Sequence, residues 1–220
     1  MNVWTLVIGV AVILVIWFIA KRFYFDPAER QQDAAVKEAM TKQAQKRDGR
    51  VELSGRQPML HVPTKHGDIQ LSFLISTDET FREHTYARFK LEQFAGKDFA
   101  ALLRSDNLLL KPLPIGTRVD LADERFNEQF VVTGNDPEFV AKVLNTEIRD
   151  KLRASLLQVS FGRRTDSSLL DRERGWLSVH TQFLKTGDVI FDLLLEAAIL
   201  FQTRFAALAT ETQKQSSAGE

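Results

Sequence analysis

Residues 69–76 read IQLSFLIS, and their alternation decides the fold class of the chain. Apolar side chains occupy every odd position, and glutamine or serine occupies all but one of the even positions. Because successive side chains of a strand point to opposite faces, this pattern predicts a strand with one buried face and one polar face. Residues 87–92 (ARFKLE) repeat the alternation without a break. The centre of the chain is therefore predicted to form a half-buried sheet.

Other short apolar segments extend this sheet on both sides. Proline and glycine residues separate them, as is typical where a chain turns between strands. We interpret the strands from Val51 to Arg104 as an antiparallel meander. The further strands are predicted at Val51–Leu53, Met59–Val62, Phe99–Arg104, Phe126–Thr133, Gln158–Gly162, Ser168–Arg172 and Trp176–Phe183.

Two amphipathic helices are predicted to cover the sheet, which makes the fold class α+β. The first opens at Asp136-Pro137 and repeats an apolar residue at every fourth position as far as Leu156. The second follows residues 186–188 (TGD) and keeps an apolar stripe as far as Leu208. This second helix is not a membrane span, because a charged residue costs about 2.5–3.5 kcal/mol at the bilayer centre. The charged residues within it are Asp192, Glu196 and Arg204.

The N-terminal segment Val3–Ala20 reads VWTLVIGVAVILVIWFIA and contains no charge. As a helix it spans about 27 Å at about 1.5 Å per residue, close to the ~30 Å hydrocarbon core of a bilayer. Bulky residues end the run and no A-x-A cleavage pattern follows, so a signal peptide is disfavoured. The segment is therefore predicted to be an uncleaved, single-pass transmembrane helix whose partner is the lipid bilayer.

Basic residues are absent before this helix and frequent after it, beginning at Lys21 and Arg22. The positive-inside rule then places the N-terminus outside and the large C-terminal part in the cytoplasm. The absence of cysteine fits a reducing compartment. Residues 26–50 are rich in helix formers, with Asp26 as a cap and Gly49 as a stop. They predict a solvated helical stalk, with a coiled coil as the alternative.

The chain is thus predicted to contain four segments. They are a transmembrane anchor at 1–25, a helical stalk at 26–50, an α+β domain at 51–210 and a disordered tail at 211–220. The third segment has the size of one ordinary domain. The formal net charge of zero argues against a general nucleic-acid binder, because such proteins carry a basic surplus for phosphate.

Residues 123–152 read DERFNEQFVVTGNDPEFVAKVLNTEIRDKL. In this stretch the chain resembles uncharacterised bacterial proteins that have an N-terminal membrane helix and a β-rich soluble domain. The resemblance covers about residues 51–209 and consists mostly of packing residues. It implies a bacterial origin, and with the anchor an inner-membrane location, but no activity. The residues that match the pattern are Asp123, Phe126, Phe130, Asp136, Leu144 and Arg149.

No catalytic, cofactor-binding or metal-binding residue is assigned from the sequence. The four histidines, at 61, 66, 84 and 180, lack a metal-ligand spacing, and the phosphate-loop, dinucleotide, nucleophile-elbow and zinc-protease motifs are absent. Charge is segregated, however, with acids concentrated at 120–138 and bases at 142–174. This pattern indicates either a polar docking face or ordinary solvated faces. The candidate interaction residues are Asp120, Asp123, Glu124, Glu128, Arg163, Arg164, Arg172 and Arg174.

These features favour a membrane-anchored, non-enzymatic interaction or scaffold module that binds a protein partner. Two alternatives stay open. One is a membrane-tethered small-molecule or lipid-binding domain, in which the sheet and the helix Asp188–Ala209 enclose an apolar pocket. The other is an enzyme with dispersed carboxylates, which requires His84 or His180 to converge with the acids of residues 120–128.

Overall fold

The chain divides into two compact units, Met1–Ala39 and Met40–Glu220. Helix α2 (Asp26–Lys46) begins in the first unit, and its last turns belong to the second. The computed structural model describes residues 14, 17, 26–54, 57–74, 84–94, 96–104, 117–162, 175–181 and 186–217.

The predicted transmembrane segment Val3–Ala20 lies outside the described residues, apart from Leu14 and Trp17, which are helical. Among the helices that are described, none combines the length and the apolar character needed to cross a membrane.

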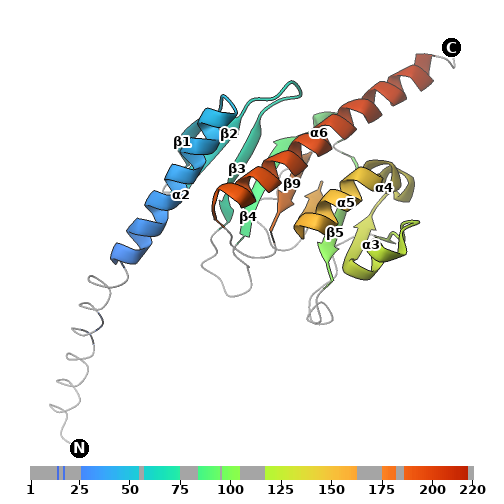
Figure 1. Cartoon of the computed structure of the whole chain (residues 1–220). Coiled ribbons are helices and arrows are strands. Elements are labelled where there is room, and N and C mark those ends of the chain that lie inside the picture. The colour runs from blue at the N-terminus through green and yellow to red at the C-terminus, as the bar shows by residue number, and fades with distance from the viewer. Residues whose placement is uncertain are drawn as a thin grey trace, which may run out of the picture. The chain divides into compact units, whose positions relative to one another are not determined.

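The described part of the second unit contains one nine-stranded antiparallel sheet (Figure 1). The predicted α+β class and antiparallel sheet are therefore confirmed. In order across the sheet the strands are β1 (Arg50–Ser54), β2 (Gln57–Val62), β3 (Ile69–Leu74), β4 (His84–Lys90), β9 (Trp176–His180), β8 (Gln158–Phe161), β5 (Phe99–Leu103), β7 (Phe130–Gly134) and β6 (Thr117–Arg118).

The strand order joins segments that are far apart in the sequence. The predicted meander is confirmed for β1 to β4 but is wrong at its next strand, Phe99–Arg104. Strand β4 pairs with β9, whose Val179 lies opposite Ala87, whereas β5 pairs with β7 and β8. The predicted strand Ser168–Arg172 lies outside the described residues. The short 3₁₀ helix η2 (Glu92–Phe94) follows β4 directly.

The long helix α6 (Asp188–Ser217) contacts β3, β4 and β9 and lies across one face of the sheet (Figure 1). Phenylalanine rings fill the space between helix and sheet. The ring centre of Phe205 lies 5.4 Å from that of Phe161 and 5.9 Å from that of Phe139. At the other end, Phe191 and Phe73 lie 5.9 Å apart. This packing forms the core of the second unit.

The sequence prediction was wrong at Phe126–Thr133, where one strand was expected. Residues Glu124–Gln129 form helix α3, and β7 begins only at Phe130. The carboxylate of Asp123 caps the helix by accepting a hydrogen bond of 3.1 Å from the backbone N–H of Phe126. The capped helix therefore forms here, although the alternation of residues in the sequence predicts a strand.

A second correction concerns the helix predicted from Asp136 to Leu156, which is two helices. Helix α4 (Pro137–Val143) ends at Leu144, and α5 (Thr146–Ser155) starts after the cap Asn145. The Asn145 side chain accepts the Ile148 N–H at 3.0 Å, and Arg149 donates to the Leu144 carbonyl at 2.8 Å. Helix α4 buries Phe139, Val140 and Val143, and α5 buries Ile148 and Leu152. The spacing of apolar residues therefore continues across the break. Leu156 ends α5 in a left-handed conformation and is exposed.

The predicted stalk and tail also differ from the structure. Met40, Gln43 and Ala44 of α2 are buried, so the stalk segment 26–50 is not solvated throughout. Asp192 on α6 accepts hydrogen bonds from Lys46 at 2.9 Å and from Arg47 at 2.8 Å. Within the predicted tail 211–220, helix α6 continues to Ser217.

Candidate functional site: the polar face of the sheet

Residues that lie opposite one another in register form rows across the sheet. One row is apolar on every strand that contributes to it, and most of its members are fully buried on the side that α6 covers. We call it the apolar row: Val51, Leu60, Leu71, Ala87, Val179, Val159, Ala101 and Val132.

The neighbouring row is displaced by one residue on every strand and therefore faces the opposite side of the sheet. With one exception, Ala100, it consists of polar or charged side chains. We call it the polar row: Arg50, His61, Gln70, Arg88, Ser178, Ser160, Ala100, Thr133 and Arg118.

The arginines at the two ends of the polar row have carboxylate partners two residues further along the chain. Arg50 pairs with Glu52 at 2.6 Å, and Arg118 pairs with Asp120 at 3.0 Å. The hydrogen bond from Arg50 lowers the pKa of the Glu52 carboxyl. These end arginines are therefore electrostatically compensated.

Arg88, at the centre of the row, is different. Among the described residues it has no carboxylate partner. Its Nε donates to the Gln70 side chain at 3.0 Å, and its guanidinium lies 4.4 Å from the ring centre of Trp176 and 5.7 Å from that of Tyr86. The next residue on the same face, Lys90, is also a cation, and it pairs with Glu92. Arg88 is thus a half-buried cation held by aromatic rings and an amide.

Three hydroxyls of the polar row are buried without a hydrogen-bond partner in the part of the chain that is described. They are Ser160, 1% exposed, Ser178, 2% exposed, and Thr133, 3% exposed. An unsatisfied buried polar group costs about 1–3 kcal/mol. The centre of the polar row therefore combines a cation and hydroxyls whose bonding capacity is not used within the described chain.

A second row on the same face flanks this centre. It runs through Ser72, Tyr86, His180 and Gln158. Burial raises the pKa of Tyr86, although Arg88 and a hydrogen bond with Ser72 act in the opposite direction. The Gln158 side chain accepts the Leu103 N–H at 3.2 Å. This row places a tyrosine, a histidine and a glutamine beside the polar centre.

The predicted acidic residues have separate roles. Asp123 is a helix cap and an ion-pair partner of Arg149, at 2.9 Å. Burial by itself raises the pKa of Asp123, but hydrogen bonds from the Phe126 N–H and from Arg149 outweigh it, so the pKa lies below its usual range. Asp120 is exposed and paired with Arg118. The predicted arginines 163, 164, 172 and 174 lie outside the described residues.

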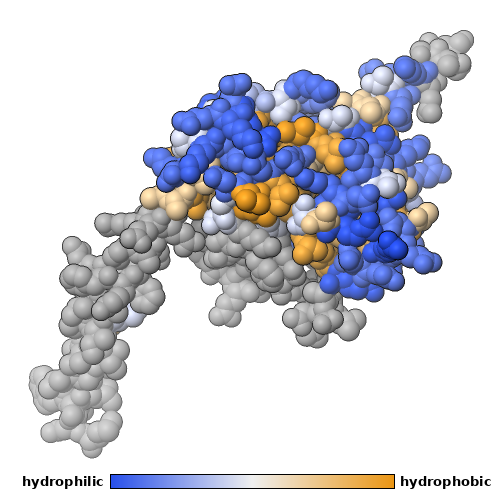
Figure 2. Space-filling model, in the orientation of Figure 1, coloured by the Kyte–Doolittle hydropathy of each residue, from blue (hydrophilic) through white to orange (hydrophobic). Residues whose placement is uncertain are grey.

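Glu124 and Glu128 are the two predicted acids that remain exposed and have no ion-pair partner among the described residues. They lie one turn apart on α3. With Arg104 and Asn127 they line an open hollow of about 290 Å³. Figure 2 shows a predominantly hydrophilic surface on this side of the molecule, over α3 and α5.

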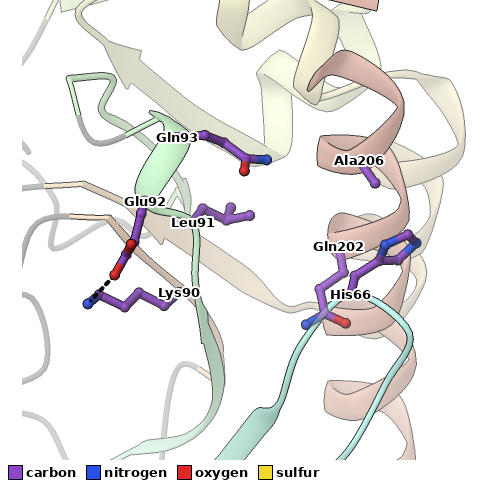
Figure 3. Close-up of a pocket in the computed structure, with 7 residues that line it drawn as sticks. All are labelled: His66, Lys90, Leu91, Glu92, Gln93, Gln202 and Ala206. Carbon is purple, nitrogen blue, oxygen red and sulfur yellow. Dashed lines mark ion pairs between the residues drawn. The ribbon is translucent and has the colours of Figure 1, made fainter. Parts of the chain in front are cut away.

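A second hollow lies beside the C-terminal end of strand β4, between η2 and α6 (Figure 3). Gln202 on α6 accepts a hydrogen bond from Thr64 at 2.7 Å and donates to the Gly67 carbonyl at 3.2 Å, which fixes the β2–β3 turn. The cleft has a volume of about 370 Å³ and is lined by His66, Lys90, Leu91, Glu92, Gln93, Gln202 and Ala206.

The structure separates His180 from the acidic residues of 120–128. Strands β8 and β5 stand between β9, which carries His180, and β7, on which α3 packs. At about 4.8 Å per strand, β9 and β7 lie about 14 Å apart. His84 lies on β4, one strand further away. Nor do the described residues contain a cluster of three or more metal-ligating side chains.

No known protein family, curated protein or solved structure matches this chain. The functional interpretation therefore depends on the geometry described above. Sequence reasoning placed Arg88 and Gln70 on the polar side of their strands but did not select them as site residues. The missing information was the register, which brings Arg88 next to Ser178.

Proposed function

We propose that this chain is a membrane-anchored, non-enzymatic interaction module. The apolar segment Val3–Ala20 supplies the anchor, and the basic residues that follow it place the folded unit on the cytoplasmic side of a bacterial inner membrane. The separation of His180 from the acids, together with the structural roles of Asp123, supports binding rather than catalysis.

The observation that carries the proposal is the acidic surface formed by Glu124 and Glu128. Both carboxylates are exposed, they lie one helical turn apart, and they border the 290 Å³ hollow. No described cation forms an ion pair with them, although Arg104 lines the same hollow, so both carboxylates are available to a basic segment of a protein partner. Asp123, the cap of the same helix, is already bound to Arg149.

The alternative of an apolar ligand beneath α6 has less support. The rings of Phe161, Phe205 and Phe139 are in contact in that layer, with centre distances of 5.4 to 6.5 Å. A lipid chain would have to displace this packing, which costs several kcal/mol for each large side chain.

The experiment is cross-linking and affinity capture of the tagged full-length chain from cells. The protein is first expected to stay with carbonate-washed membranes, and its release would contradict the anchor. Glu124→Lys/Glu128→Lys is expected to reduce recovery of the partner at least about tenfold, since it reverses two contacts of the surface. The reduction is measured by quantitative mass spectrometry.

The matched control is Glu138→Lys/Glu147→Lys. These two glutamates are also exposed, unpaired among the described residues and located in first helical turns, so both variants change the net charge equally. Capture by the control is expected to equal that of the unmodified chain. Equal capture by all three proteins would reject the proposal that the surface formed by Glu124 and Glu128, here called the α3 surface, binds the partner.

A further inference from the structure

We propose that Arg88, Ser178 and Ser160 form a binding site for the oxyanion group, phosphate or carboxylate, of a small molecule. The site lies on the polar row and shares no residue with the α3 surface. It is therefore independent of the proposed capture of a protein partner.

The first step is the charge of Arg88. The end arginines of the row have Glu52 and Asp120 beside them, but the corresponding neighbours of Arg88 are Tyr86 and Lys90. A half-buried cation without a nearby carboxylate raises the local potential, and an anion that binds there is screened less by water than at the surface. The centre of the row thus favours negative charge more than its two ends, where the arginines are already paired.

The second step is the orientation of the guanidinium. Gln70 accepts the Nε–H, and the Trp176 ring lies 4.4 Å from the guanidinium carbon. Neither terminal nitrogen of Arg88 has an acceptor among the described residues. A guanidinium held in this way keeps a fork of donors, which matches two oxygens of a carboxylate or phosphate.

The third step is the hydroxyl groups. Ser178 lies directly opposite Arg88 in register, and Ser160 lies directly opposite Ser178. The three strands place the backbone positions of these residues within about 10 Å, at about 4.8 Å per strand. Both hydroxyls are buried and lack a partner in the described chain, so each can donate to the same oxyanion. The two hydroxyls are buried and aromatic rings lie beside the guanidinium, which favours a small molecule over a protein surface.

The test uses the full-length chain with Trp4→Phe and Trp17→Phe. The sequence contains three tryptophans, so Trp176 becomes the sole tryptophan and reports on the site. Inorganic phosphate and benzoate are titrated separately at constant ionic strength, with chloride as the balancing anion. At least one of the two is expected to change the Trp176 fluorescence in a saturable way, and the one that does identifies the oxyanion class.

Three variants give the expected pattern. Arg88→Gln is expected to weaken binding at least about tenfold, the loss typical of charge-assisted hydrogen bonds. Arg88→Lys is expected to weaken it less, because the charge stays but the fork is lost. Ser178→Ala is expected to weaken it several-fold while leaving the melting temperature unchanged or raised, since this hydroxyl has no described partner to lose.

The control is Arg118→Gln, which removes an arginine of the same row that is already paired with Asp120. It is expected to leave binding unchanged. The proposal is overturned if neither anion gives a saturable signal, or if Arg118→Gln weakens binding as much as Arg88→Gln. It is also overturned if Ser178→Ala lowers the melting temperature and leaves the affinity unchanged.

Discussion

The apolar row and the polar row cross the same sheet one residue apart, and they differ in almost every property. Members of the apolar row are packed beneath α6, where their burial stabilises the fold. At the centre of the polar row, Ser160 and Ser178 are equally buried but make no hydrogen bond in the described chain. Since burial without a partner destabilises, the polar row is the part of the sheet that folding alone does not explain.

The first test of this contrast concerns the apolar face of the sheet. Phe161 adjoins Ser160 on β8 but faces α6, with its ring centre 5.8 Å from that of Phe99 and 5.4 Å from that of Phe205. Phe161→Ala is expected to lower the free energy of unfolding by about 3–5 kcal/mol, because it removes a buried ring and leaves a cavity. Urea denaturation measures the change. A loss below about 1 kcal/mol would contradict the assignment of this face as the core.

A polar side chain with partners should behave differently from those of the polar row. Asp123→Ala is expected to cost about 1–2 kcal/mol at neutral pH, since it removes the cap of α3 and the partner of Arg149. Asp123→Asn keeps a capping oxygen and should cost less.

The same residue predicts a pH dependence. The pKa of Asp123 is lower in the folded chain than its unfolded value of about 3.9, so its contribution is fully present above that pH. As the pH falls through the folded pKa, the unmodified chain and Asp123→Ala should converge in stability. Unfolding curves at neutral and acidic pH measure this, and a gap that widens in acid would contradict the pairing.

The smallest expected effect concerns Thr133, a buried member of the polar row. Thr133→Val keeps the shape and removes a hydroxyl that has no partner in the described chain, so stability should be unchanged or higher by up to about 1 kcal/mol. Thr64→Val is the matched control, because the Thr64 hydroxyl donates to Gln202 and its loss should cost about 1 kcal/mol. Equal losses in both variants would show that Thr133 has a partner.

Much of the fold could be predicted from residue periodicity, because alternation reports local environment. The strands around Leu71 and Phe89 were predicted in this way, and so was the apolar stripe of α6. Periodicity failed where a capping side chain decided the structure. Asp123 starts a helix inside a predicted strand, and Asn145 divides a predicted helix.

The candidate site was less predictable than the fold, because it depends on register. The sequence places Arg88 on a polar face, but nothing local to β4 indicates that Ser178 lies opposite it. Such long-range pairing is set by the packing of the whole sheet. The α3 acids were selected from charge alone, and the structure divides them into the internally bound Asp123 and the exposed Glu124 and Glu128.

The pairing of β4 with β9 also has a consequence for biosynthesis. During translation β1 to β4 emerge early, but the strand that joins them to β8 emerges only with residues 176–180, followed by α6. Until then the nascent chain holds β4 as an unpaired edge, and such edges recruit other strands. Completion of the sheet therefore depends on a strand that is synthesised after all its neighbours, so that a chain truncated before β9 retains an unclosed, aggregation-prone centre.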